Sequence, residues 1–296
     1  MSNAIVPSKP SAKIIADSLS EWGIRLTTME VTMHRFILAE FNTHRAFSRN
    51  SASSRAIPVW KIIERVETDP AYPVSWPAEQ SGMSGGEELV DPDLAVAKAA
   101  WDSARKHALD TAKLLKDVRL HKSIINRLLE PFMWHTVIVT STQWANFFAQ
   151  RCNPAAQPEM QAVAYAMKEA YLASTPVRLL DYNDYHLPYI DQQTMDSIGR
   201  YIVDHPDNNA QELAARIAIA RCARVSYLTH DGVRDIEKDL ELFYKLETSG
   251  HWSPFEHVAS SIYPYSGEPS GNFTGWKQFR QHYFNECVYD IPEDSE

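Results

Sequence analysis

Two hydrophobic periods occur in this chain, and their order along it restricts the fold more than any other feature. Every second residue is apolar in residues 29–34, which is typical of a half-buried strand. We expect this strand to enter the segment FILAEFNTHR, residues 36–45, and to deliver His44 and Arg45 at its end. The chain therefore contains at least one sheet that must be covered on its apolar face.

The other period is helical, with apolar residues recurring every three or four positions. It predicts four helices, over residues 91–115, 157–172, 210–225 and 234–248. The first helix would begin with Asp91 as its cap and Pro92 in its first turn. Its predicted buried face consists of Trp101, Ala104, Ala108, Ala112 and Leu115. Because strands and helices mix without regular βαβ alternation, we expect an α+β (irregular α/β) fold, a mixed sheet with flanking helices.

Length and composition fit one globular domain. A chain of 296 residues, 44% of them hydrophobic, can bury a sizeable core, and its length alone permits one large domain or two modest ones. We expect a single domain over residues 1–296. The glycine- and acid-rich stretch at 79–91 has no period and is expected to be a mobile surface loop. No apolar run approaches the roughly 20 residues of a membrane-spanning helix. The opening residues also lack an export signal, so a cytoplasmic protein with no membrane partner is expected.

Net charge and cysteine spacing exclude several classes of partner. A net charge of -9 argues against a nonspecific nucleic-acid binder, which needs a basic face. An anionic ligand is therefore expected to be small and bound by local arginines. Cys152, Cys222 and Cys287 lie far apart, so the sequence indicates neither a disulfide framework nor a zinc site, and we expect buried, inert thiols.

The densest polar cluster is residues 43–55, which contain three arginines, a histidine and four serines. Guanidinium groups, hydroxyls and backbone N–H groups are the partners that phosphate prefers, although a solvated polar loop has the same composition. Arg127 and Arg151 are single arginines in apolar surroundings, where an arginine either binds a ligand or pairs with a carboxylate.

The segment HWSPFEH, residues 251–257, has two histidines and a glutamate, but Pro254 interrupts the helix that paired ligands would need. No metal site is expected. The sequence also lacks the GxGxxG, GxxxxGK[ST] and GxSxG motifs of dinucleotide-binding, P-loop and hydrolase folds.

The cluster at 43–55 resembles the motif of the flavin-dependent thymidylate synthases. Six residues match the form HRxxSxNxxSxR of that family, namely His44, Arg45, Ser48, Asn50, Ser53 and Arg55. Two positions differ, because Thr43 replaces the first arginine and Ser51 replaces the usual glutamate. The resemblance implies flavin contacts at His44, Arg45 and Asn50, and nucleotide contacts at Ser53 and Arg55.

The resemblance continues further along the chain. Residues 127–131 resemble the ARxxLP segment, and residues 146–159 resemble the NFLxLRxxxxAQxE helix of the family. This implies a flavin contact at Asn146 and nucleotide contacts at Arg127 and Arg151, with Arg151 at the pyrimidine ring. Thr142 and Ala155 replace flavin-contacting residues of the family.

The remaining motifs occur in permuted order. Residues 223–227 (ARVSY) and 250–257 (GHWSPFEH) resemble motifs that precede the arginine-rich loop in the family. They imply flavin contacts at Ser226, Ser253 and Glu256. Residues 277–283 resemble a degraded copy of the strand that leads into that loop, and Gln278 is assigned there to the substrate.

The resemblance implies flavin-dependent one-carbon transfer to C5 of a pyrimidine deoxynucleotide. The expected reaction converts dUMP to dTMP with methylenetetrahydrofolate, NADPH and bound FAD, in a homotetramer with sites shared between subunits. Arg151 and Ser53 take the catalytic positions, Ser53 by binding nucleotide rather than as a nucleophile. Two alternatives stay open, a dUMP or dCMP hydroxymethylase of the same family and a noncatalytic nucleotide-binding protein.

Overall fold

A mixed sheet forms the centre of the fold in the computed structural model, which describes residues 8–179, 181, 184–229, 232, 234–267 and 270–287. Its strands lie in the order β3-β4-β2-β1-β5. They are β1 (Ser11–Leu19), β2 (Arg25–His34), β3 (Ser48–Ser51), β4 (Trp134–Ser141) and β5 (Val177–Arg178). The β1–β5 pair is parallel and the other pairs are antiparallel. The expectation of an α+β fold with a mixed sheet is confirmed.

The alternating segment lies in β2, where Met29, Val31 and Met33 are fully buried against one helical layer. The expected continuation of the strand into residues 36–45 is wrong. The chain instead turns at His34 into a 3-10 turn (η1, Arg35–Ile37) and a short helix, α1 (Leu38–Phe41). The consecutive residues Phe36, Ile37 and Leu38 all contact the same core, whereas consecutive residues of a strand would point to opposite faces.

All four predicted helices occur, as α3 (Asp93–Asp117), α6 (Pro158–Ala173), α8 (Ala210–Arg224) and α9 (Ile236–Thr248). Asp91 does not cap α3, because the capping position falls at Pro92 and no side chain bonds there. Ala104 is exposed, and Leu109 joins Ala112 as a fully buried residue of that helix. The other helices are α2 (Val59–Thr68), α4 (Lys122–Ile125), α5 (Ala145–Arg151) and α7 (Gln192–Asp204).

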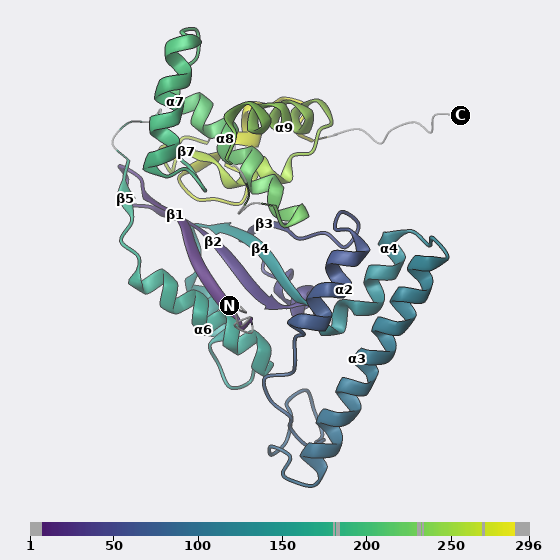
Figure 1. The fold of residues 1–296 in the computed structure, drawn as a ribbon. Helices are drawn as coiled ribbons and strands as arrows, with labels where there is room; N and C mark the ends of the chain where they lie inside the picture. Colours follow the sequence, from purple (N-terminus) through teal and green to yellow (C-terminus); the bar gives the residue numbers. More distant parts are fainter. Residues whose placement is uncertain are drawn as a thin grey trace, which may run out of the picture.

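Three helical groups surround the sheet (Figure 1). One face packs on α5 and α6, and the opposite face carries Ile138, which packs against Cys222 and Val225 at the end of α8. The third group, α2, α3 and α4, lies beside the sheet around its own apolar cluster, and α3 projects from it. None of the helices in the described part of the chain is long and apolar enough to span a bilayer.

A second sheet joins the carboxyl-terminal third to the centre. It has the order β6-β7-β8, with β6 at Tyr185–His186, β7 at Ala259–Ser261 and β8 at Trp276–Gln278. Its residues contact the central sheet through a buried chain of polar groups. His186 Nε2 and Thr140 Oγ1 each lie 2.7 Å from Thr28 Oγ1, and Thr140 Oγ1 lies 2.7 Å from His257 Nδ1.

The sequence led to expectations about the cysteines and about the loop at 79–91. Cys222 is buried as expected, but Cys287 is exposed, so the expectation of buried thiols is wrong for that residue. Residues 76–89 fold back as a loop, in which Ala78 N–H donates to the Glu87 carbonyl at 2.7 Å. The expected mobility of residues 79–91 stays a prediction.

Candidate functional site

The polar cluster of residues 43–55 ends in a turn that is held by distant parts of the chain. Ser53 N–H donates to the carbonyl of Ser226 at 3.0 Å, in the short 3-10 turn after α8 (η3, Val225–Tyr227). The buried amide of Asn126 donates to the carbonyls of Ser54 at 2.7 Å and Ile57 at 3.0 Å. The turn is therefore fixed by the carboxyl-terminal third on one side and by the α4 region on the other.

Four arginines converge on a recess of 340 Å³ beside this turn, which we call the arginine recess. It is lined by Arg35, Leu38, Arg49, Asn50, Ser51, Ala52, Ser53, Ser54, Arg55, Arg127, Ser226, His251 and Ser253. No acidic side chain is among these lining residues of the described chain. Five separate stretches of the chain contribute to it, so the site exists only in the folded chain.

The arginine recess carries an excess of positive charge. Arg35 and Arg127 share a single carboxylate, because both donate to Glu130 Oε1, at 3.0 and 2.9 Å. Arg49 donates to backbone carbonyls, at 3.0 Å to Asn42 and 3.1 Å to His44. Arg55 is exposed, and its guanidinium has no hydrogen-bond or ion-pair partner among the described residues. Forked donors that are not neutralised are suited to an oxyanion such as phosphate.

A second recess of 470 Å³, the histidine recess, lies where residues 43–47 meet the start of α5. Its lining combines amides and a guanidinium with buried rings, from Thr43, His44, Arg45, Ala46, Phe47, Gln143, Asn146, Phe147 and Gln150. Arg45 is exposed there and has no ion-pair partner in the described chain. The composition suits a planar polar ring system that needs both an apolar surface and hydrogen-bonding groups.

Arg151 borders this recess through His44. Its Nε donates to His44 Nε2 at 3.0 Å, and its guanidinium also pairs with the carboxylate of Glu40. Burial lowers the pKa of His44 to about 4, and the positive charges of Arg151 and Arg49 act in the same direction. His44 is therefore neutral near pH 7, and because its Nε2 accepts, its proton is on Nδ1.

The structure divides the sequence-predicted residues between two recesses of one chain. Asn50, Ser53, Arg55, Arg127, Ser226 and Ser253 line the arginine recess, and His44, Arg45 and Asn146 line the histidine recess. Arg151 lies with the second group, so it does not meet Arg127 within a single chain.

Two of the predicted residues are committed to contacts inside the fold. Glu256 pairs with the guanidinium of Arg280, although it lies close enough to Arg49 to influence that residue's pKa. Gln278 is buried, and its amide donates to Ser48 Oγ at 2.8 Å. Ser53 Oγ accepts from Arg55 N–H at 3.3 Å and has no base beside it among the described residues.

The departures from the family motif also have structural uses. Thr43 Oγ1 donates to the Glu40 carbonyl at 2.7 Å, and Thr142 Oγ1 accepts from Thr274 N–H at 3.2 Å. Ala155 lines a third recess of 580 Å³, under the loop at 76–89. None of these three side chains offers the positive charge or ring nitrogen of the family residues.

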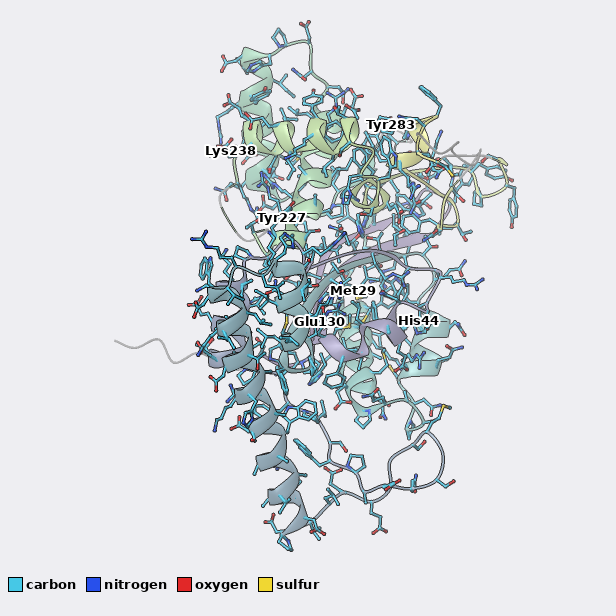
Figure 2. All side chains as sticks on the ribbon, turned by 90° about the vertical axis from the view of Figure 1, so that its right-hand side faces the viewer. Met29, His44, Glu130, Tyr227, Lys238 and Tyr283 are labelled. Carbon is cyan, nitrogen blue, oxygen red and sulfur yellow. The ribbon has the colours of Figure 1, made fainter. Side chains whose placement is uncertain are left out.

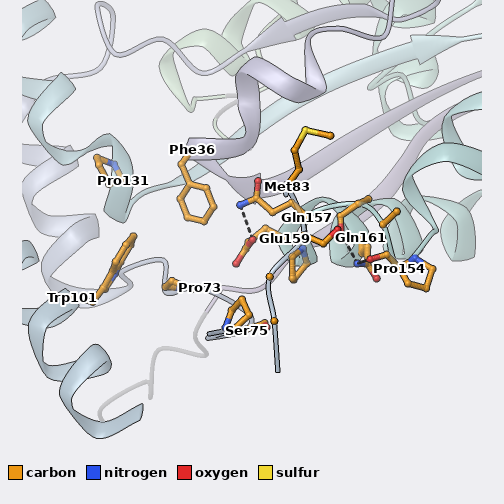
Figure 3. Close-up of a pocket in the computed structure, with 17 residues that line it drawn as sticks. Phe36, Pro73, Ser75, Met83, Trp101, Pro131, Pro154, Gln157, Glu159 and Gln161 are labelled. Atoms are coloured by element: carbon orange, nitrogen blue, oxygen red, sulfur yellow. Dashed lines mark hydrogen bonds between the residues drawn. The ribbon is translucent and has the colours of Figure 1, made fainter. Parts of the chain in front are cut away.

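The third recess is mainly apolar, with Phe36, Trp101 and several prolines around it (Figure 3). Its buried carboxylate, Glu159, accepts from Val74 N–H at 2.9 Å and from the Gln157 amide at 3.0 Å. Gln161 donates to the Ala156 carbonyl at 2.6 Å. These polar groups are used to fix the start of α6 and the neighbouring loop, so we assign this recess no ligand.

The two histidines of HWSPFEH lie in different surroundings. His251 is exposed and lines the arginine recess, whereas His257 is fully buried and bonds Thr140. No group of three potential metal ligands gathers within the described ranges.

Sequence reasoning missed Arg35, Arg49 and His251 as lining residues of the arginine recess. Arg49 lies inside the polar cluster and Arg35 directly follows a buried strand, so the sequence could have indicated both as site residues. His251 was considered only as a metal ligand.

Comparisons with known proteins give limited resemblance. Neither the family models nor the curated proteins include a match to this chain. Among solved structures, the UMP/dUMP methylase PolB from Streptomyces cacaoi bound with 5-Br UMP is 14% identical over 55% of this chain and 89% of that chain, with a TM-score of 0.46. The flavin-dependent thymidylate synthase ThyX from Helicobacter pylori, complexed with FAD and dUMP, is 18% identical over 49% of this chain and 67% of that chain, with a TM-score of 0.35. The chain thus has low-identity structural similarity to these enzymes over about half its length.

Proposed function

We propose that this protein is an enzyme that transfers a one-carbon unit to C5 of a pyrimidine deoxynucleotide, converting dUMP to dTMP. The observation that carries the proposal is the arginine recess. Within it, the side chains of the sequence motif at 50–55 meet Arg127 and Ser226 around a surplus of positive charge. A nucleotide monophosphate supplies the compact anion that such a recess would neutralise.

Arg55 and Arg127 are assigned to the phosphate, with Ser53 as a hydroxyl partner. Arg55 offers its whole guanidinium, and Arg127 keeps part of its own because it shares the Glu130 carboxylate with Arg35. A bound phosphate would therefore compete with few internal partners.

FAD is proposed for the histidine recess, because its residues fit a flavin chemically. Asn146, Gln143 and Gln150 provide amides for the polar edge of the ring, and Phe47 and Phe147 provide an apolar wall. Neutral His44 can hydrogen-bond there without adding charge. A bound flavin would supply hydride transfer from NADPH to the one-carbon unit that methylenetetrahydrofolate donates.

Arg151 is proposed to act at the pyrimidine ring. C5 of uracil is nucleophilic when the ring carries enolate-like negative charge on a carbonyl oxygen, and a guanidinium beside that oxygen would stabilise this charge. Its Nε and one terminal nitrogen are used by His44 and Glu40, which hold the group in place and leave the other terminal nitrogen as a donor. Because Arg127 lines the arginine recess and Arg151 borders the histidine recess through His44, we propose that a second copy of the chain brings them together, in a homotetramer.

A noncatalytic nucleotide-binding protein is the second candidate. It is favoured by Thr43, Thr142 and Ala155, which supply no charge where the family has flavin-contacting side chains. A hydroxymethyl product would keep the same nucleotide site and is separated from dTMP by product analysis.

Calorimetric titration of the FAD-treated protein with dUMP tests the nucleotide site. Arg55→Ala removes charge-assisted hydrogen bonds worth about 1.5–3 kcal/mol, so the affinity should fall about tenfold or more. Because the Arg55 guanidinium has no partner in the described chain, folding should not suffer. The matched control is Arg200→Ala, because Arg200 is an exposed arginine of α7 that donates to Ser197 away from the recess, and this variant should bind dUMP as the wild type does. A wild type that fails to bind dUMP, or an Arg55→Ala variant that binds it equally well, would refute the proposal.

A further inference from the structure

The arginine recess and the histidine recess have no lining residue in common within the described chain, but one side chain contacts both. Arg49 lines the arginine recess, and its Nη1 donates at 3.1 Å to the carbonyl of His44, which lines the histidine recess. In the view of Figure 2, His44 and Glu130, the carboxylate partner at the arginine recess, lie to either side of Met29 in the central sheet. Arg49 therefore joins two parts of the site that are otherwise separate.

The position of Arg49 is fixed at both ends of the side chain. Its backbone belongs to β3 and lies opposite Val139 of β4. Its Nη1 donates to the carbonyls of Asn42 at 3.0 Å and His44 at 3.1 Å, just after the end of α1. A helix end leaves carbonyl groups without internal partners, so Arg49 supplies donors that this turn needs. The guanidinium thus holds the segment that carries His44.

The other edge of the Arg49 guanidinium is unused. Its Nε and Nη2 carry three of the five N–H groups, and neither donates to a residue that the structure describes. Burial lowers the pKa of Arg49 by desolvation, and the nearby Glu256, which is paired with Arg280, acts only partly against this. A partly desolvated guanidinium with two free, parallel donors favours an oxyanion as its partner.

We propose that Arg49 is a positioning residue that couples the two recesses. An oxyanion in the arginine recess binds Nε and Nη2, and the guanidinium held in this way orders the His44 segment for a ring in the histidine recess. The oxyanion is the phosphate of the nucleotide, so this inference rests on the proposed function. The coupling is positive, because the anion leaves the carbonyl bonds of Nη1 in place and the first ligand bears the entropy cost of ordering the segment.

This coupling has a consequence for the proposed assembly. There the arginine recess of one chain meets the histidine recess of another, so each chain contributes its two recesses to two different sites. Arg49 would then connect neighbouring sites through a single chain. Nucleotide bound at one site would strengthen flavin binding at the next, and flavin would strengthen nucleotide binding by the same factor.

The experiment titrates riboflavin into the protein at pH 7, in sodium phosphate and in sodium chloride of equal ionic strength, and follows flavin fluorescence. Riboflavin has no phosphate of its own that could occupy the arginine recess. Phosphate should raise the affinity for riboflavin about fivefold. Without any flavin, phosphate should also shift the ring NMR signals of His44, which are assigned by their loss in His44→Gln.

Two variants separate the link from simple charge. Arg49→Lys keeps the positive charge, but one ammonium group cannot bond both carbonyls and an anion in the geometry of the guanidinium fork. Its gain with phosphate should disappear, although it still binds riboflavin. Arg127→Met is the matched control, because Arg127 lines the same recess and donates to Glu130 rather than to the 42–44 backbone. It should need more phosphate and then reach the same fivefold gain.

Two results would overturn the coupling. One is a wild type that binds dUMP and riboflavin but shows neither the gain nor the His44 shift, which leaves the proposed function standing. The other is an Arg49→Lys variant that keeps the whole gain, because charge alone would then explain it. If the Arg49 variants do not fold, the wild-type His44 response decides. A protein that shows both changes with phosphate but forms no dTMP would retain the coupling and refute the proposed function.

Discussion

Ser53 and Ser226 are joined by a backbone hydrogen bond of 3.0 Å, although they come from opposite ends of the chain. Both line the arginine recess. The bond ties the polar turn after β3 to the end of α8, so the two motif segments that occur in permuted order meet at one place. Predictions about the nucleotide site therefore concern the whole fold and not one loop.

Arg127 is predicted to bind nucleotide rather than support the fold. Its side chain is half exposed, and it shares the carboxylate of its ion-pair partner, Glu130, with Arg35, so Arg127→Ala should leave the unfolding free energy nearly unchanged. The affinity for dUMP should fall about tenfold, which raises the apparent KM with little change in kcat. Steady-state kinetics and calorimetry check this, and flavin content should stay at the wild-type level. An Arg127→Ala variant with wild-type affinity for dUMP would show that Arg127 is a surface residue that does not bind the nucleotide.

Arg151 is predicted to affect turnover and the titration of His44. The pKa of His44 is lowered to about 4 by burial first and by the charges of Arg151 and Arg49 next, so Arg151→Ala should raise it toward its ordinary value. An NMR titration of the His44 ring measures this shift. Arg45→Ala is the control, because Arg45 is not among the charges that shift His44, and its His44 pKa should match the wild type. Arg151→Ala should also lower kcat at saturating dUMP.

Three buried histidines are predicted to make the protein sensitive to acid. Burial lowers the pKa of His135, His186 and His257 to about 3, so each stays neutral in the fold but gains a proton in the unfolded chain below about pH 6.5. The unfolded state binds more protons between these values, so stability is complete above pH 6.5 and falls as the pH drops toward 3. Each histidine contributes up to about 1.4 kcal/mol per pH unit in that range.

Urea unfolding from pH 7 to pH 4 measures the acid effect. His186→Gln removes one titrating group from the chain of polar side chains between the two sheets, so its unfolding free energy should depend less steeply on pH than that of the wild type. His107→Gln, at an exposed position of α3, is the control and should leave the slope unchanged. Equal slopes for wild type and His186→Gln would contradict the burial argument.

Asp239 is predicted to be a major structural residue of the upper helices. It is 1% exposed and pairs with Arg221 at 3.0 Å and with Arg224 at 2.7 Å. Asp239→Asn would leave the buried charge of Arg221 uncompensated, at a cost of about 3–5 kcal/mol in unfolding free energy. Urea unfolding measures the loss, and Glu237→Gln, an exposed change on the same helix, should cost almost nothing. A loss below about 1 kcal/mol for Asp239→Asn would show that water or another group compensates Arg221.

Local patterns predicted four of the helices and the presence of a strand, because each reflects contacts within a few residues, but α2, α4, α5 and α7 were not predicted. The error at residues 36–45 arose because the pattern of FILAEF fits two structures. A strand would bury alternate residues, and a short helix can equally bury Ile37 and Phe41. The exposure of Ala104 depends on how far α3 projects beyond its neighbours, and the spacing of apolar residues within one helix does not reveal this. Cys287 was wrongly expected to be buried, because its exposure also depends on how distant parts of the chain pack.

The candidate site was predictable in composition but not in arrangement. The resemblance to the family motifs identified Ser53, Arg55 and Arg127, which line one recess. The separation of Arg151 from Arg127 depends on how α5 and the α4 region pack, and the contribution of Arg35 depends on a turn that the strand prediction did not include.

The most direct test of the central claim is product analysis by mass spectrometry after incubating the protein with FAD, dUMP, methylenetetrahydrofolate and NADPH. The account predicts dTMP, formed only when FAD is present and lost together with dUMP binding in Arg55→Ala. Unchanged dUMP from protein that demonstrably holds both FAD and dUMP would contradict it and would favour a noncatalytic nucleotide-binding protein.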